Sequence, residues 1–234
     1  MKRILLPALL LILAVACQKD YMMATSLQEM GSFDGKVFVS DRGIKFNIVS
    51  DESETPLKDA AERVFVKFDI MRPNSDGYDI VVRSWLIPLV KDWRKRSSLT
   101  QDDDFGNDPI RVNGGWIGGG YMNMEVVIYF LPESETRHLV NLVLEDTPPD
   151  PDTLRFTMMH NAYGEVPSPQ SLKEEDPEVK YSRGVSTVCF PTEGMIPADK
   201  EEMPFKISST WYAVDDDGNY LLKEQSTVGM LRSR

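Results

Sequence analysis

The chain has 234 residues, of which 41% are hydrophobic and 27% are charged, and its formal net charge is −11. This length and apolar content are enough for one large domain or two small domains with real hydrophobic cores. Because phosphate backbones are bound by basic patches, the acidic balance argues against a nucleic-acid partner.

The first residues have the pattern of an export signal. Lys2 and Arg3 precede an apolar run, Ile4–Leu13, which is interrupted only by a proline. A bilayer needs about 20 apolar residues, so this run is too short to span it and instead suits a secretory leader. The leader ends in small residues followed directly by Cys17, which resembles a bacterial lipobox, although Ala14 stands where Leu is usual. An ordinary secretory signal with a chance cysteine is the alternative reading.

We therefore predict that residues 1–17 are a lipoprotein signal peptide ending at Cys17, whose thiol carries palmitate-type acyl chains. Two or more such chains hold a protein stably on a membrane. The membrane, through Cys17, is thus an expected partner, and the expected location is the bacterial cell envelope, at the outer membrane. The surface and periplasmic faces both remain open. Loss of Lys2 and Arg3 with the leader changes the net charge from −11 to −13.

After a polar tether over residues 18–32, the first folded unit is predicted over residues 33–107. Alternating apolar residues around Asp41–Gly43 predict a hairpin with Ile44, Phe46 and Ile48 facing inward. Arg63–Met71 alternates in the same way, and Tyr78–Leu86 returns as another strand after a turn. Pro56–Glu62 has room for a short helical turn. Four or five short strands in about 70 residues suit a small barrel that is closed on itself, as in an OB-like domain.

The second unit is predicted over residues 108–234, after a polar, charge-rich boundary at 92–107. Tyr121–Leu131 and Arg137–Glu145 are its longest strand candidates. Glycines between 114 and 120 indicate sharp turns or close backbone approach, but not a phosphate-binding loop. Since no segment has a sustained 3.6-residue apolar stripe, the predicted class is all-β, with an antiparallel β-sandwich as the second unit.

Four segments resemble a known family: Gly106–Ile110, Asn113–Trp116, His138–Val143 and His160–Glu165. Together they resemble the NigD-like lipoproteins. The resemblance implies an N-terminal OB-like domain and a C-terminal β-sandwich behind a lipoprotein signal, which agrees with the two units above. It also implies association with a bacteriocin operon, but it supplies no catalytic residues.

The only histidines are His138 and His160, and the only thiol besides Cys17 is Cys189. A Cys–His nucleophilic pair is one reading, since a thiolate needs an adjacent base. The simpler reading is that both histidines flank strands and that Cys189 is a buried small residue. Two histidines and one thiol are few for a zinc site, which usually takes four ligands. No catalytic residue, metal or other cofactor is therefore assigned.

Two weaker candidate sites remain. Asp215, Asp217 and Glu224 have part of the spacing of a calcium loop, but the first ligand position and the flanking helices are missing. A hairpin turn with exposed carboxylates is the simpler reading. Trp93, which lies among charged residues, is the expected exposed aromatic contact for a sugar or peptide.

These features predict a non-enzymatic, lipid-anchored envelope protein that serves as an accessory or binding module for a protein or glycan. The alternative is a bacteriocin-associated secretion or self-protection factor. An envelope hydrolase is a third reading that no pair of residues singles out.

Overall fold

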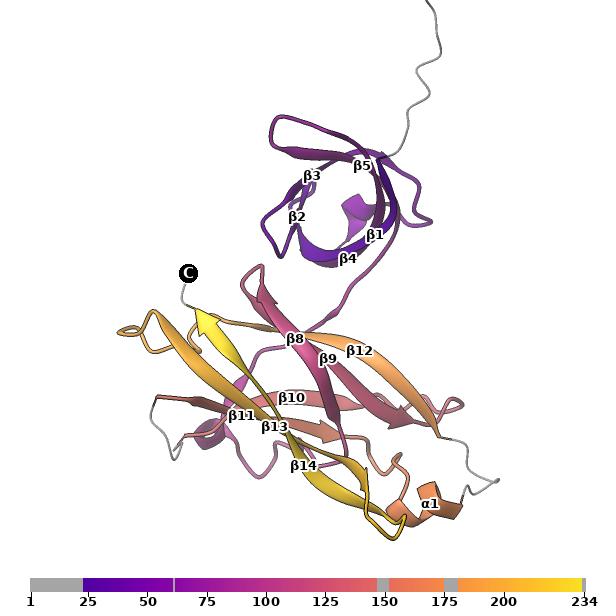
Figure 1. The fold of residues 1–234 in the computed structure, drawn as a ribbon, viewed down its shortest axis with the longest axis vertical. Helices are drawn as coiled ribbons and strands as arrows, with labels where there is room; N and C mark the ends of the chain where they lie inside the picture. Colours follow the sequence, from indigo (N-terminus) through magenta and orange to yellow (C-terminus); the bar gives the residue numbers. More distant parts are fainter. Residues whose placement is uncertain (1–22, 61, 147–151, 175–180, 233–234) are drawn as a thin grey trace, which may run out of the picture.

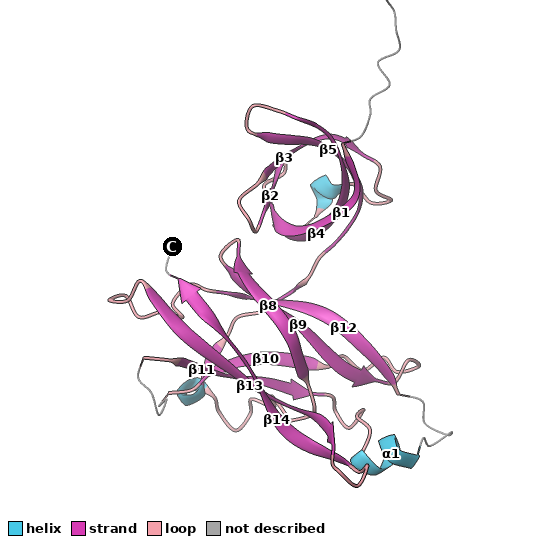
Figure 2. Ribbon diagram, viewed as in Figure 1, coloured by secondary structure: helices cyan, strands magenta, loops and turns pink. Residues whose placement is uncertain are grey.

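The computed structural model describes residues 23–60, 62–146, 152–174 and 181–232. Strands dominate this part of the chain and form two modules, a small barrel and a larger two-layer sandwich (Figure 1). Helical structure is limited to short segments at loops (Figure 2). The predicted class and the order of the two modules are confirmed. Within the described residues, no helix is long and apolar enough to cross a membrane.

The N-terminal module is a closed barrel of five strands in the order β1-β2-β3-β5-β4. The strands are β1 (Ala24–Phe33), β2 (Val37–Ser40), β3 (Lys45–Asp51), β4 (Arg63–Pro73) and β5 (Gly77–Leu86). Strands β3 and β5 pair in parallel, and the other neighbours pair antiparallel. Closure leaves no free sheet edge, which removes unpaired backbone groups from a module this small.

The barrel core follows the alternation in the sequence. Val64, Val66 and Phe68 on β4 are fully buried, and Phe46 on β3 is 2% exposed. The rings of Phe46 and Phe68 pack together, with their centroids 4.7 Å apart. The 3-10 turn η1 (Leu57–Asp59) lies in the predicted helical stretch and inserts Leu57 into this core.

The C-terminal module consists of two packed sheets. One has the order β14-β13-β11-β10-β7, and the other has the order β6-β12-β9-β8. Their strands are β6 (Leu89–Val90), β7 (Arg94–Lys95), β8 (Arg111–Gly118), β9 (Tyr121–Phe130), β10 (Leu139–Leu144), β11 (Leu154–Asn161), β12 (Ser182–Pro191), β13 (Glu202–Val214) and β14 (Tyr220–Arg232). The short segments η2 (Arg96–Ser98) and α1 (Pro169–Glu174) lie in connections.

Side chains from both sheets fill the space between them. Met124 and Val126 on β9 meet Leu142 on β10, Phe156 on β11 and Ile207 on β13 in one buried cluster. Three pairs of strands are parallel, β7 with β10, β6 with β12 and β11 with β13. The last pair is parallel because β12, between β11 and β13 in sequence, belongs to the opposite sheet. The predicted sandwich is confirmed, but its sheets are mixed, whereas the sequence predicted an antiparallel sandwich.

Two predicted module limits are wrong. Residues 24–32 are not tether, because β1 closes the barrel by pairing with both β2 and β4. Most of the first half of β1 faces solvent, which explains its polar sequence. The chain also enters the sandwich before residue 108, because β6 and β7 add edge strands to its two sheets.

Candidate functional site

A buried ion pair lies where the barrel meets the sandwich. Asp41 follows β2, and Arg63 is the first residue of β4, so both belong to the barrel. Arg63 Nη1 and Nη2 each donate to one oxygen of Asp41 at 2.6 Å. The two side chains are only 3% and 5% exposed, although both come from barrel ends. Burial on this scale requires that another part of the chain covers the pair.

The covering groups come from β8 and β9 of the sandwich. Trp116 Nε1 donates to Asp41 Oδ2 at 2.6 Å, and Asn123 Nδ2 donates to the same oxygen at 3.1 Å. Arg63 Nη2 in turn donates to Asn123 Oδ1 at 2.8 Å. The guanidinium carbon of Arg63 lies 4.6 Å from the centre of the Tyr121 ring, a cation–π distance. We call Asp41, Arg63, Trp116, Tyr121 and Asn123 the junction cluster.

Glycines in the β8–β9 turn allow this close approach. A Cβ on Gly118 would lie 2.5 Å from Asp41 Cβ, and one on Gly119 would lie 2.4 Å from Asp41 Oδ1. Gly119 also has a φ of +60°, a backbone conformation that other residues rarely adopt. The close backbone approach predicted for these glycines is therefore confirmed, and its partner is the barrel.

The charges of the junction cluster are matched. Burial alone would lower the pKa of Arg63, but the hydrogen bonds and charge of Asp41 outweigh it, so that the pKa is raised. Cys189 on β12 lies beside the same guanidinium and is fully buried. Burial raises the pKa of this thiol, with only partial opposition from Arg63. Since the nucleophile would be the thiolate, this setting disfavours a reactive cysteine.

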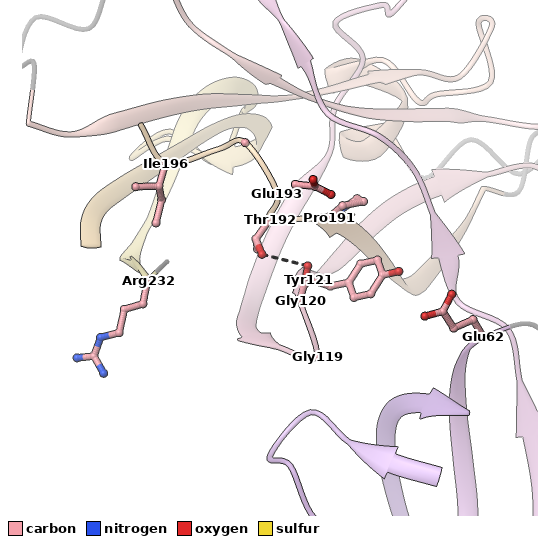
Figure 3. A pocket seen from close by; sticks show the side chains of 10 residues that line it. Glu62, Gly119, Gly120, Tyr121, Pro191, Thr192, Glu193, Ile196 and Arg232 are labelled. Carbon is pink, nitrogen blue, oxygen red and sulfur yellow. Dashed lines mark hydrogen bonds between the residues drawn. The ribbon is translucent and has the colours of Figure 1, made fainter. Parts of the chain in front are cut away.

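A pocket of about 480 Å³ opens beside the cluster (Figure 3). Glu62 supplies its barrel side, and the β8–β9 turn and the segment after β12 supply its sandwich side. Thr192 holds that segment in place by donating from its backbone N and its Oγ1 to the carbonyl oxygen of Gly120, at 2.9 and 3.0 Å. The pocket is lined by Glu62, Gly119, Gly120, Tyr121, Pro191, Thr192, Glu193, Gly194, Ile196 and Arg232.

The lining of this pocket is chemically mixed. It combines an aromatic ring, open glycine backbone and charged groups of both signs, and it contains no cysteine or histidine. Pockets between modules are a common location for ligand sites. Across the described residues, no group of three or more His, Cys, Asp or Glu side chains is placed to hold a metal ion.

The two histidines lie together in the sandwich. His138 Nδ1 and His160 Nε2 are 3.1 Å apart, and His160 Nδ1 lies 3.0 Å from the carbonyl oxygen of Pro109. The pKa of His160 is lowered to about 4, first by burial and then by the charge of His138. Each histidine therefore contacts the other, whereas Cys189 interacts with Arg63. The structure does not assemble the Cys–His pair considered from the sequence.

The structure also separates the three carboxylates of the candidate calcium loop. Asp215 Oδ1 accepts the backbone N–H groups of Asp217 and Asn219, at 3.0 and 2.7 Å, in the β13–β14 turn. Glu224 lies further along β14 opposite Thr210, and accepts a hydrogen bond from Ser208 at 3.0 Å. Asp215 and Asp217 therefore belong to a hairpin turn and Glu224 to the strand after it, as the simpler interpretation of the sequence expected.

The other two predicted residues have different outcomes. Cys17 lies outside the described residues. Trp93 is only partly exposed and packs against the sandwich core, so that at most part of its ring is free for a ligand. Trp116 is the tryptophan with the larger exposure, at 39%. A contact role for Trp93 stays a prediction.

Sequence reasoning missed Asp41, Arg63 and Asn123. Asp41 looks like an ordinary turn residue, and Arg63 falls on the polar face of its strand. The one available signal was the glycine run at 118–120, which indicated close approach without naming the partner.

Comparison with known proteins agrees with this architecture. Residues 94–172 match the model of the NigD-like C-terminal beta sandwich domain. This region runs from β7 into α1 and includes both histidines and Asn123. The chain thus carries a NigD-like C-terminal β-sandwich domain, and the resemblance inferred from its motifs is confirmed. No curated protein matches the sequence.

Several solved structures share the whole two-module fold. A protein provisionally named as toxin related, from Parabacteroides distasonis, has a TM-score of 0.60 at 21% identity, over 88% of this chain and 93% of that one. A NigD-like immunity protein from Bacteroides caccae has a TM-score of 0.57 at 18% identity, over 87% and 92%. A protein provisionally named as a lipoprotein, from Bacteroides fragilis, has a TM-score of 0.59 at 9% identity, over 87% and 96%. At these sequence identities, the similarity to the solved structures shows the fold alone.

Proposed function

We propose that the chain is a non-enzymatic, lipid-anchored protein of the cell envelope that acts as an accessory or binding module for a protein or glycan. The observation that carries the proposal is the junction cluster. It connects the two β modules through side-chain hydrogen bonds and leaves a pocket of about 480 Å³ beside the contact. A fixed junction spares a ligand the entropy cost of ordering two loosely linked modules.

The binding role can be tested by site-specific photo-crosslinking in intact cells. A photoreactive side chain replaces Ile196, which lines the pocket, or Val49, an exposed barrel residue outside the pocket lining. We expect a discrete, reproducible adduct from position 196 and none from position 49. Equal labelling from both positions, or none from position 196, would contradict a ligand site at the junction.

The anchor at Cys17 is supported by the lipobox pattern and by the lipoprotein name of the Bacteroides fragilis relative. Labelling cells with a palmitate analogue should mark the wild-type chain, and Cys17→Ser should abolish the mark. Protease treatment of intact cells then distinguishes the surface of the outer membrane from its periplasmic face. A chain that fractionates as soluble periplasmic protein without the label would overturn the anchor.

The absence of enzymatic activity is part of the same proposal. It is supported by the contact of the two histidines with each other and by the burial of Cys189, which raises the pKa of its thiol. Hydrolysis of envelope glycans or peptides that is lost on replacing His138, His160 or Cys189 would show the proposal to be wrong.

A second candidate is a bacteriocin-associated secretion or self-protection factor. The observation that favours it is the shared fold with the NigD-like immunity protein from Bacteroides caccae. Deleting the gene should then raise sensitivity to a toxin of the producing strain or change its release. Unchanged sensitivity and unchanged release would remove this candidate.

A further inference from the structure

The motifs around His138 and His160 converge on one turn of the sandwich. His160 is on β11, directly opposite Val140 of β10, and His138 lies just before β10 begins. After β11 the chain turns through Ala162 and Tyr163 to Glu165, whose carboxylate returns to His138. Three separate segments therefore meet at a chain of ring nitrogens and carboxylate oxygens.

The carbonyl oxygen of Pro109 fixes the direction of each hydrogen bond in this series of side chains. The carbonyl of Pro109 only accepts, so His160 must carry its proton on Nδ1, 3.0 Å away. The lowered pKa of His160, about 4, leaves its other nitrogen, Nε2, as an acceptor. His138 Nδ1, 3.1 Å from that acceptor, must then donate its own proton.

The other end of this hydrogen-bonded series, between His138 and Glu165, requires one more proton. His138 Nε2 lies 3.6 Å from Glu165 Oε2, and both atoms are buried without a hydrogen-bond partner among the described residues. The pKa of Glu165 is lowered, first by hydrogen bonds from Ser134 and Thr136 and then by His138, so that its carboxylate is ionised. With His138 neutral, two acceptors would face each other in a buried place, which is costly.

The turn that this contact holds has a strained backbone. Tyr163 has a φ of +53°, which is rare for a residue other than glycine, and its side chain is 52% exposed. The turn is fixed by Asp108, which accepts the Ala162 N–H at 2.7 Å, and by Asn161, which accepts the Tyr163 N–H at 2.8 Å. Strained residues of this kind persist only when the surroundings hold them.

We propose that His138 is doubly protonated in the folded chain and forms a proton-dependent latch with Glu165, which holds the Ala162–Glu165 turn and displays Tyr163. The titratable groups that face the latch within the described residues are His160 from β11, Glu165 from the turn and Asp108 from the segment before β8. Without that second proton, His138 Nε2 would face Glu165 Oε2 as a second acceptor, so the contact would be lost and the turn would loosen. The latch is independent of the junction pocket and of the proposed ligand.

The test is nitrogen-15 NMR of the histidine rings in the Cys17→Ser chain, followed through a pH titration. We expect His138 to show two protonated nitrogens and His160 to show a single proton on Nδ1. The backbone amides of Ala162, Tyr163 and Glu165 should shift together with the His138 ring signals. A singly protonated His138 at every pH where the chain is folded, or turn amides that ignore its titration, would overturn the latch.

Two matched variants sharpen the test. Glu165→Gln provides an amide that can donate to neutral His138 Nε2, so the turn should stay ordered and its pH-dependent shift should be lost. Glu133→Gln removes the same charge from an exposed position in the loop before β10, and should leave the shift unchanged. Equal behaviour of the two variants would count against the latch.

Discussion

The junction cluster and the histidine cluster (His138, His160 and Glu165) are both polar and largely buried, but they differ in how their hydrogen-bond donors and acceptors are matched. In the junction cluster, Asp41 and Arg63 bring one charge of each sign, and Trp116 and Asn123 add matching donors. The histidine chain ends in two facing acceptors unless His138 takes an extra proton. The first arrangement therefore pairs its charges without an added proton, whereas the second depends on a second proton on His138.

The largest expected effect comes from breaking the junction cluster at its shared acceptor. Asp41→Ala leaves the Arg63 guanidinium buried without its counter-ion, which typically costs about 3–5 kcal/mol in the free energy of unfolding. Urea denaturation measures the loss. The matched control is Asp76→Ala, which removes an exposed ion pair with Lys45 and should cost about 0–1 kcal/mol. Similar losses for the two variants would mean that the cluster does not stabilise the fold.

A slightly smaller effect is expected from filling the space at the turn. Gly119→Ala places a Cβ 2.6 Å from Arg63 Nη1 and requires a left-handed alanine, at a combined cost of about 2–4 kcal/mol. Gly35→Ala also has positive φ but nothing within 4 Å, so it isolates the backbone cost of about 1–2 kcal/mol. Equal denaturation midpoints would show that the sandwich turn does not press on the barrel.

The histidine cluster should make stability depend on acid pH. Because the pKa of His160 is about 4 in the folded chain and near 6.5 when unfolded, the unfolded state binds more protons between these values. The contribution of His160 to stability is therefore full above about pH 6.5 and falls by up to about 3 kcal/mol as pH drops toward 4. Subtracting the pH profile of His160→Asn isolates this contribution from that of the carboxylates. Parallel profiles would contradict the assignment of a neutral, buried His160.

The smallest effect concerns the thiol beside the junction. Cys189 is fully buried, and its pKa is raised by burial, so the native chain should react with aromatic disulfide reagents only as it unfolds. The Cys17→Ser chain, in which Cys189 is the only thiol, gives the rate directly. Fast labelling under native conditions would show that the junction opens readily.

The sequence predicted those strands in which apolar and polar residues alternate, because one face of the strand lies in the core and the other faces solvent. The alternation of Val64, Val66 and Phe68 placed β4 correctly, because one face of a barrel strand is core and the other is solvent. It missed most of β1, whose first half is largely solvent-exposed and carries no apolar alternation. It also missed β6 and β7, because strands of two residues have no period to detect.

The candidate site was less accessible to sequence reasoning. The junction cluster joins positions 41, 63, 116 and 123, which no local pattern connects, and its charged members look like ordinary surface residues. The histidine motifs were visible as similar segments, but their contact depends on the pairing of β10 with β11. Register and module contact are tertiary properties, so they appear only in the folded chain.

The central claim is that the junction cluster makes the barrel and the sandwich one rigid unit. Residual dipolar couplings of backbone amides, measured in one weakly aligning medium, test it directly. If the claim is right, couplings from barrel strands and sandwich strands fit a single alignment tensor, and Asp41→Ala splits them into two. Two different tensors in the unaltered chain would show that the modules move independently and would contradict the account.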